Sequence, residues 1–118
     1  MAGLNDHIVP WESAYKGARL FGGKRRFVLS SSGHIQALVN PPPREGAETR
    51  ASYRVTDDVP DNAEDFLARA PRLAGSWWSD WDAWLEQRSG GLRPAPSALG
   101  NADYKPQAKA PGTYVLAN

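Results

Sequence analysis

The sequence predicts an α/β fold on three observations. The apolar run Phe27–Leu29 is continuous rather than alternating, which is typical of a strand buried on both faces of a parallel sheet. Helical periodicity precedes this run near residues 10–21 and follows it near 62–70 and 77–88. Residues 90–118 are rich in glycine, proline, alanine and asparagine and lack periodicity. We therefore expect one or two sheet strands, three helices and an irregular C-terminal tail.

The first helix and the strand after it have clear boundaries. Pro10 suits the start of a helix, where its missing N–H leaves no hydrogen bond unmade. Apolar side chains then recur on one face at Trp11, Ala14, Tyr15 and Ala18. Glycines at 22–23 end the helix, and residues 25–30 form the predicted strand. The apolar segment 35–39 is expected to pack against the sheet edge as a short helix or an extended segment.

Two more elements are predicted between residues 51 and 71. Residues 51–56 fit a short edge strand. Asp61 and Glu64 have the spacing of a capping box, which predicts a helix start at this point. Pro71 ends that helix.

The third helix carries most of the tryptophans. Its periodicity places a large apolar group on one side, made of Trp77, Trp81, Trp84 and Leu85, with Trp78 beside it. We expect this face to be core, because rings of this size dominate packing energies. A docking surface for an apolar polymer or a partner protein is the alternative. If a larger domain normally covers the helix, the rings would be exposed in this chain alone.

The length and composition of the chain exclude several classes of function. A length of 118 residues allows at most one small domain. The 14 basic residues nearly balance the 13 acidic ones, so nothing predicts binding to nucleic acid or an anionic membrane. There is no cysteine, which excludes disulfides, a thiol nucleophile and cysteine metal ligands within the chain. No signal peptide and no membrane-spanning run of about 18 apolar residues is visible, so a cytoplasmic chain is expected.

Asp6 and His34 are the candidate catalytic residues. His34 follows the predicted buried strand and a loop of small residues, which is how α/β enzymes present a general base. Asp6 lies upstream, separated from it by one helix and one strand, and in α/β hydrolases the acid likewise precedes the histidine. Such an acid holds the imidazole in the correct tautomer, at a distance of roughly 2.6–3.2 Å. A structural, hydrogen-bonded histidine is the alternative.

Other candidate sites are weaker. His7 adjoins Asp6, but neighbouring side chains on an extended segment diverge, so we expect it to be a bystander. The serines at 30–32 do not lie in a G-x-S-x-G elbow and are too close in sequence to His34 to be its nucleophile. No metal-ligand spacing such as HExxH is present, so neither a metal nor a cofactor is expected.

Four motifs, in this order, resemble the C-terminal part of poly(3-hydroxyalkanoate) synthases, the bacterial polymerases that make polyester storage granules. They are DHIVPW at 6–11, SSSGHIQALVNPP at 30–42, GSWWSDWDAWL at 75–85 and APGTYV at 110–115. The resemblance implies the C-terminal fragment of an α/β-hydrolase fold. Residues 1–89 would be the end of the catalytic domain, and residues 90–118 its irregular tail.

The resemblance also implies the chemistry. The family uses a Cys-Asp-His triad, in which the aspartate matches Asp6 and the histidine matches His34. The cysteine lies upstream in the family and has no counterpart in this sequence. The intact enzyme would polymerise (R)-3-hydroxyacyl-coenzyme A into polyester with release of coenzyme A, in the cytoplasm or at the granule surface. The resemblance also implies a second copy of the enzyme as a partner, in a homodimer.

We expect the isolated chain to be inactive, because it lacks the cysteine. The alternative function is a non-catalytic module that binds granules or dimerises with an intact synthase through the tryptophan-rich helix. A fragment of an unrelated hydrolase or thioesterase is a third interpretation, which the tryptophan motif at 75–85 disfavours.

Overall fold

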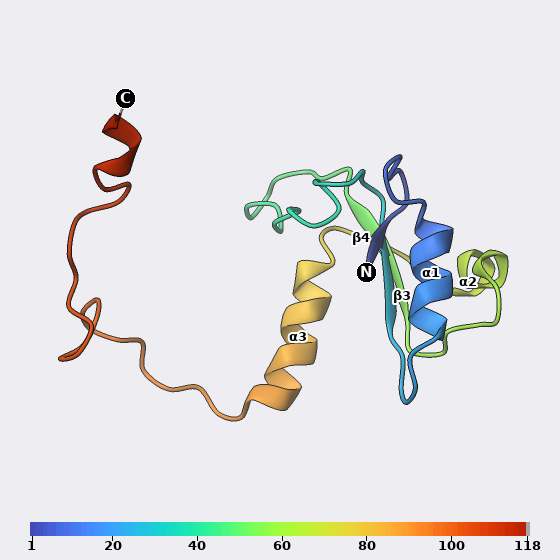
Figure 1. The fold of residues 1–118 in the computed structure, drawn as a ribbon. Coiled ribbons are helices and arrows are strands. Elements are labelled where there is room, and N and C mark those ends of the chain that lie inside the picture. The colour runs from blue at the N-terminus through green and yellow to red at the C-terminus, as the bar shows by residue number, and fades with distance from the viewer. Residues whose placement is uncertain (118) are drawn as a thin grey trace.

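The computed structural model describes residues 1–117, and it shows a four-stranded sheet with helices on both faces (Figure 1). The predicted α/β class is therefore confirmed. The elements, in chain order, are β1 (Ala2–Gly3), α1 (Trp11–Arg19), β2 (Phe27–Ser30), β3 (Ser52–Thr56), α2 (Ala63–Arg69), β4 (Arg72–Ala74), α3 (Trp78–Ser89) and the short 3-10 helix η1 (Tyr114–Leu116).

The sheet is mixed, with strand order β1-β2-β3-β4. β1 and β2 are parallel and are joined through α1, whereas β2 pairs with β3, and β3 with β4, in antiparallel fashion. The prediction of one or two strands was too low. β4 was missed because it is only three residues long and none of its residues is buried. The strand predicted at 51–56 is present as β3, but it is not at the edge of the sheet, because β4 pairs with its outer side.

An aromatic cluster forms the core between the sheet and the first two helices. Phe66 of α2 is fully buried and contacts Trp11 and Tyr15 of α1 and Phe27 of β2, with ring centroids 5.2–6.2 Å apart. The Tyr15 hydroxyl donates to the carbonyl of Pro60 at 2.6 Å, which satisfies its polar end inside the core. This cluster fixes α1 against β2 and so fixes the positions of the loops at either end of α1.

The cap of α2 differs from the predicted one. Asn62, not Asp61, is the N-cap, and its side-chain oxygen accepts from the backbone N–H of Asp65 at 2.7 Å. Asp61 instead pairs with Arg19 of α1 at 2.6 Å. The sequence contains two adjacent residues that both suit an N-cap, and the residue types alone do not distinguish them.

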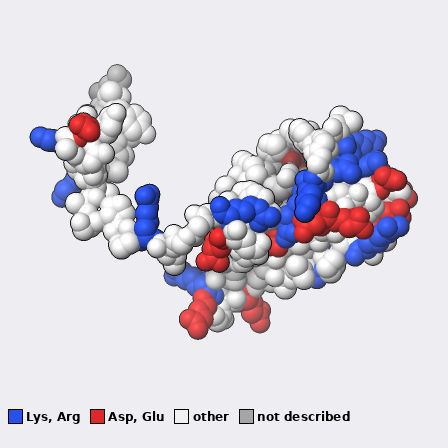
Figure 2. Space-filling view, turned by 90° about the horizontal axis from the view of Figure 1, so that it is seen from below, with Lys and Arg blue, Asp and Glu red and all other residues white. Residues whose placement is uncertain are grey.

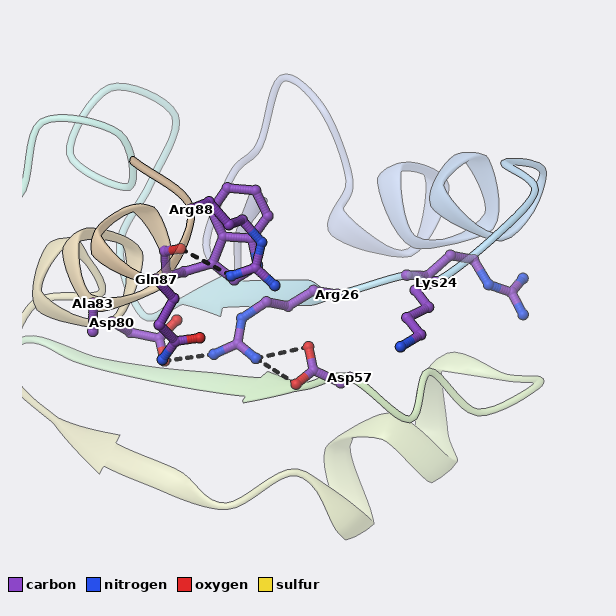
Figure 3. Close-up of a pocket in the computed structure, with 9 residues that line it drawn as sticks. Lys24, Arg26, Asp57, Asp80, Ala83, Gln87 and Arg88 are labelled. Atoms are coloured by element: carbon purple, nitrogen blue, oxygen red, sulfur yellow. Dashed lines mark hydrogen bonds and ion pairs between the residues drawn. The ribbon is translucent and has the colours of Figure 1, made fainter. Parts of the chain in front are cut away.

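α3 lies on the opposite face of the sheet from α1 and α2 (Figure 1). Arg26, just before β2, bonds Asp57 at 2.7 Å and Asp80 of α3 at 2.6 Å, which ties the helix to the sheet (Figure 3). No residue of α3 is buried, and the Trp81 side is 45% exposed. The prediction that the tryptophan face forms core is therefore wrong for this chain, because Trp77, Trp78 and Trp84 are only half-buried and Trp81 is exposed.

The segment after α3 runs away from the folded body (Figure 1). The only regular element between Ser89 and Ala117 is η1, whose side chains are all exposed. The radius of gyration is 19.0 Å, whereas a compact domain of this length would have about 13–14 Å. Asn118, the last residue of the predicted tail, lies outside the described residues.

Charged side chains of both signs lie next to one another on the face of the body that Figure 2 shows. The tail in that view carries few of either sign. Within residues 1–117, no helix is both long and apolar enough to cross a membrane.

Candidate active site

The backbone that follows Asp6 fixes its carboxylate. Oδ1 of Asp6 accepts hydrogen bonds from the backbone N–H groups of Ile8 and Val9, both at 2.9 Å. Such a turn is a common use of aspartate just before a helix, because the side chain replaces a backbone acceptor. With one oxygen held in this way, the second oxygen has a defined direction.

That second oxygen meets His34. Oδ2 of Asp6 lies 2.8 Å from Nδ1 of His34, within the range that the sequence analysis predicted. An ionised carboxylate can only accept, so Nδ1 must be the protonated nitrogen and Nε2 is left able to take a proton. The Asp6 side chain is 9% exposed and the His34 side chain 43% exposed. The acid is therefore enclosed while the imidazole is open to whatever lies beside it.

Hydrogen bonding holds the pKa of Asp6 low. The backbone N–H of Val9 is the largest cause, and the contacts with His34 and the N–H of Ile8 add to it, lowering the pKa from 3.8 to about 2. Partial removal from water acts in the opposite direction but is outweighed. Asp6 is thus ionised throughout the neutral range and can stabilise an imidazolium when His34 takes a proton.

The two loops meet because the strands that precede them are parallel neighbours. The carboxyl ends of β1 and β2 lie at the same edge, and the backbone N–H of Leu4 bonds the carbonyl of Ser30 at 2.7 Å. Asn5 adds a second hydrogen bond between the two loops, because its side-chain amide donates to the carbonyl of Ser31 at 2.7 Å. Sequence reasoning missed Asn5, because its partner is a backbone carbonyl, which every residue type carries.

Gly3 allows the close approach of these loops. A Cβ at this position would lie 2.7 Å from the carbonyl oxygen of Ser32 and 2.8 Å from Cβ of Ala37. Both contacts are shorter than atoms tolerate, and neither partner is the end of a flexible side chain. The absence of a side chain at Gly3 is therefore part of how the structure brings His34 to Asp6.

We expect Gly3→Ala to destabilise the chain by about 1–3 kcal/mol, because the loop of His34 must move to make room. The measurement is urea unfolding, together with the NMR signals of the His34 ring. Gly17→Ala is the matched control, because a Cβ at Gly17 in α1 would meet nothing within 4 Å. It should stabilise the helix by up to about 1 kcal/mol. Equal stabilities for the two variants would contradict this account of Gly3.

The other sequence candidates do not join the site. His7 is exposed, and the hydrogen bond of Asp6 goes to His34 rather than to its neighbour, as expected of a bystander. Ser30 is fully buried, and the Ser31 hydroxyl accepts from the backbone N–H of Ser52 at 3.1 Å. Among residues 1–117, no three or more His, Cys, Asp or Glu side chains cluster as metal ligands would.

One cavity lies beside the Asp6–His34 pair, and a larger one lies away from it. A cavity of about 190 Å³ adjoins it and is lined by Gly3, Asp6, Val9, His34 and Leu38, among others. A larger cleft, of about 840 Å³, lies between the start of β2 and α3 (Figure 3). Its lining is mainly charged, and it lies at the opposite end of β2 from His34. We assign the candidate site to the smaller cavity, because only there do the acid and the base meet.

Exposed apolar side chains follow both members of the pair along the chain. They are Ile8 and Val9 after Asp6, and Ile35, Leu38 and Val39 after His34, with exposures between 45% and 70%. A cluster of this kind on one small chain is typical of a surface that another part of a protein covers.

Comparison with known proteins gives a consistent set of relatives. No family model matches the chain. The chain is 47% identical over 116 residues to poly(3-hydroxyalkanoate) polymerase 2 and 46% identical over 115 residues to polymerase 1, both of Ectopseudomonas oleovorans. It is 46% identical over 112 residues to the poly(3-hydroxyalkanoate) polymerase subunit PhaC of Cupriavidus necator. These matches cover 95–98% of this chain but only 18–20% of each relative.

Proposed function

This chain belongs to the poly(3-hydroxyalkanoate) synthase family, of whose curated members it spans about a fifth, and we propose that it supplies the acid and the base of their active site. Asp6 and His34 would be two members of a Cys-Asp-His triad, and the cysteine would come from a part of the polymerase outside these 118 residues. The observation that carries the proposal is the bond from Nδ1 of His34 to a carboxylate whose other oxygen is held by two backbone N–H groups.

The pair fits the chemistry of thioester polymerisation. A free thiol has a pKa of about 8.5, so it needs a base to react near neutral pH. Nε2 of His34 would take the thiol proton, and Asp6 would stabilise the resulting imidazolium. The thiolate would attack the thioester carbon of a (R)-3-hydroxyacyl-coenzyme A. The bond from that carbon to the coenzyme A sulfur would then break, and the proton on His34 would pass to the leaving thiolate.

Chain growth needs a second deprotonation. A 3-hydroxyl group must lose its proton to attack the next acyl thioester, and His34 of the same pair would accept that proton. The hydroxyl oxygen would bond to the thioester carbon, the bond from that carbon to the coenzyme A sulfur would break, and the proton on His34 would pass to the leaving sulfur. The cavity beside the pair and the exposed apolar side chains near it suit an acyl substrate and a growing polyester. No cofactor enters this scheme.

The fold agrees with a place in a larger α/β-hydrolase domain. β1 is the edge strand next to the site and is only two residues long. We place the rest of the hydrolase sheet beyond β1, with residues 1–89 as part of the catalytic domain and 90–118 as its irregular tail. The enzyme would work in the cytoplasm or at the surface of the polyester granule.

A second candidate function rests on α3. Trp81 and Trp84 stack with their ring centroids 4.8 Å apart, while Trp81 and Leu85 remain 45% and 37% exposed. This face could bind polyester granules or mediate dimerisation with an intact synthase. Co-sedimentation of the chain with washed polyester granules tests this function, and a folded chain that stays in the supernatant would remove its support.

We expect the isolated chain to release no coenzyme A from (R)-3-hydroxybutyryl-coenzyme A, because it contains no cysteine. The measurement is a thiol-trapping assay on the purified chain, with buffer alone as the background. A polymerase that contains this stretch should give steady release under the same conditions. Turnover by the isolated chain above background would show that the proposed triad is not needed.

A further inference from the structure

The first two tryptophans of the GSWWSDWDAWL motif hold the segment that follows His34. The indole N–H of Trp77 donates to the carbonyl of Ala37 at 2.7 Å, and that of Trp78 donates to the carbonyl of Leu38 at 2.8 Å. The hydroxyl of Ser76 donates to the carbonyl of Asn40 in the same segment. Ser76, Trp77 and Trp78 are consecutive residues just before or at the start of α3. Their side chains therefore donate hydrogen bonds to three backbone carbonyls that lie 36–40 residues earlier in the chain.

The bonded segment is one compact turn that begins beside His34. The N–H of Ala37 bonds the carbonyl of Gly33 at 2.8 Å, and the N–H of Val39 bonds that of Ile35 at 2.9 Å. These bonds resemble a single helical turn, which leaves the carbonyls at its end without partners of their own. The indole N–H groups satisfy two of those carbonyls. They act on this turn much as a cap acts on a helix.

The position of this turn determines the position of His34 relative to Asp6. His34 lies inside the turn, and Ala37 is 2% exposed and packs on Gly3 of β1. A shift of the turn would therefore carry His34 away from Asp6. α3 itself is tied to the sheet through Asp80 and Arg26, so the indoles donate from a fixed helix.

We propose that Trp77 and Trp78 are positioning residues for His34, acting through their indole N–H groups on the carbonyls of Ala37 and Leu38. The inference rests on the proposed function of the Asp6–His34 pair. It gives this part of the tryptophan motif a role other than core packing or surface docking. Trp81 makes no such bond among the described residues, which separates it from the first two.

The test uses phenylalanine, which keeps a six-membered aromatic ring but removes the N–H together with the five-membered ring of the indole. The 118-residue chain is labelled with 15N-histidine, and the ring nitrogens are observed by long-range 1H–15N NMR at mildly alkaline pH. His7→Gln assigns the two histidines. In the unaltered chain, the Nδ1–H tautomer of His34 is expected to be the major form, because Nδ1 donates to Asp6. In Trp77→Phe/Trp78→Phe it should become the minor form.

Trp81→Phe is the matched control and should leave the tautomer ratio unchanged. Far-UV circular dichroism checks that the double variant is folded, and the single variants serve if it is not. An unchanged ratio in a folded double or single variant would overturn the positioning role alone. A minor Nδ1–H form in the unaltered chain would instead count against the Asp6–His34 pair, so the two failures are distinguishable.

Activity provides an independent readout in a polymerase that contains this stretch. The double variant should lower kcat on the order of 10–100-fold with little change in KM, since misplacement of a catalytic group affects the chemical step rather than substrate binding. The control for activity is Tyr104→Phe, which removes a polar hydrogen from an aromatic side chain that is 77% exposed in the tail. Its kcat should match that of the unaltered enzyme, and equal kcat values for the double variant and this control would contradict the role of the indole N–H groups.

Discussion

Replacing His34 with glutamine in a polymerase that contains this stretch is expected to lower kcat by about 10³–10⁴-fold, the loss typical of a missing triad member. Glutamine can still accept and donate hydrogen bonds, so the turn that starts at Gly33 should persist. It cannot take a proton from a thiol, however. The measurement is steady-state release of coenzyme A at saturating substrate. Asp6→Asn should also be strongly impaired, because an amide favours the wrong imidazole tautomer.

His7→Gln is the matched control for this result. His7 adjoins Asp6 in the sequence, but it is exposed and lies outside the pair. Its replacement should leave kcat within about twofold of the unaltered enzyme, as expected for a surface side chain away from the chemistry. If His7→Gln and His34→Gln lose activity equally, the assignment of the base to His34 is wrong.

Phe66→Ala is expected to destabilise the 118-residue chain by about 3–5 kcal/mol. Phe66 has no exposed surface and is the side chain through which α2 contacts the other three rings of the aromatic cluster. Small domains are stable by only about 5–15 kcal/mol, so this one change can leave much of the chain unfolded. Urea unfolding followed by tryptophan fluorescence gives the free energy of unfolding.

Phe21→Ala removes the same ring from the surface. Phe21 is 73% exposed, after the end of α1. Its loss should change the free energy of unfolding by no more than about 0.5 kcal/mol. Similar losses for the two variants would mean that the aromatic cluster does not form the core of this chain.

Local sequence signals were sufficient for the elements with strong periodicity. α1 was predicted because its apolar residues all face the aromatic cluster, and β2 because Phe27 and Leu29 are buried on one face while Val28 faces α3. The sequence did not predict β4, because the strand is short and exposed and depends on pairing with β3. Pairing across a sheet is a tertiary effect that periodicity does not encode.

The geometry of the candidate site was predicted only in part. The Asp6–His34 contact followed from the order of acid, helix, strand and histidine, which fixes two loops at one sheet edge. Asn5, Trp77 and Trp78 were not assigned to it. Each acts by donating a hydrogen bond to a backbone carbonyl that is distant in sequence. Every residue type carries a backbone carbonyl, so the pattern of side chains in the sequence does not indicate which carbonyl accepts the hydrogen bond. The tryptophans were instead interpreted as core, because size was the only feature visible in the sequence.

The most direct test of the central claim is the reactivity of the proposed triad cysteine with iodoacetamide as a function of pH. It is measured by peptide mass spectrometry in an intact polymerase that contains this stretch, and then in its His34→Gln variant. If the Asp6–His34 pair activates the thiol, the unaltered enzyme is alkylated rapidly near neutral pH. The variant should react slowly there and accelerate only towards the ordinary thiol pKa of about 8.5. Superimposable pH profiles for the two proteins would contradict the account.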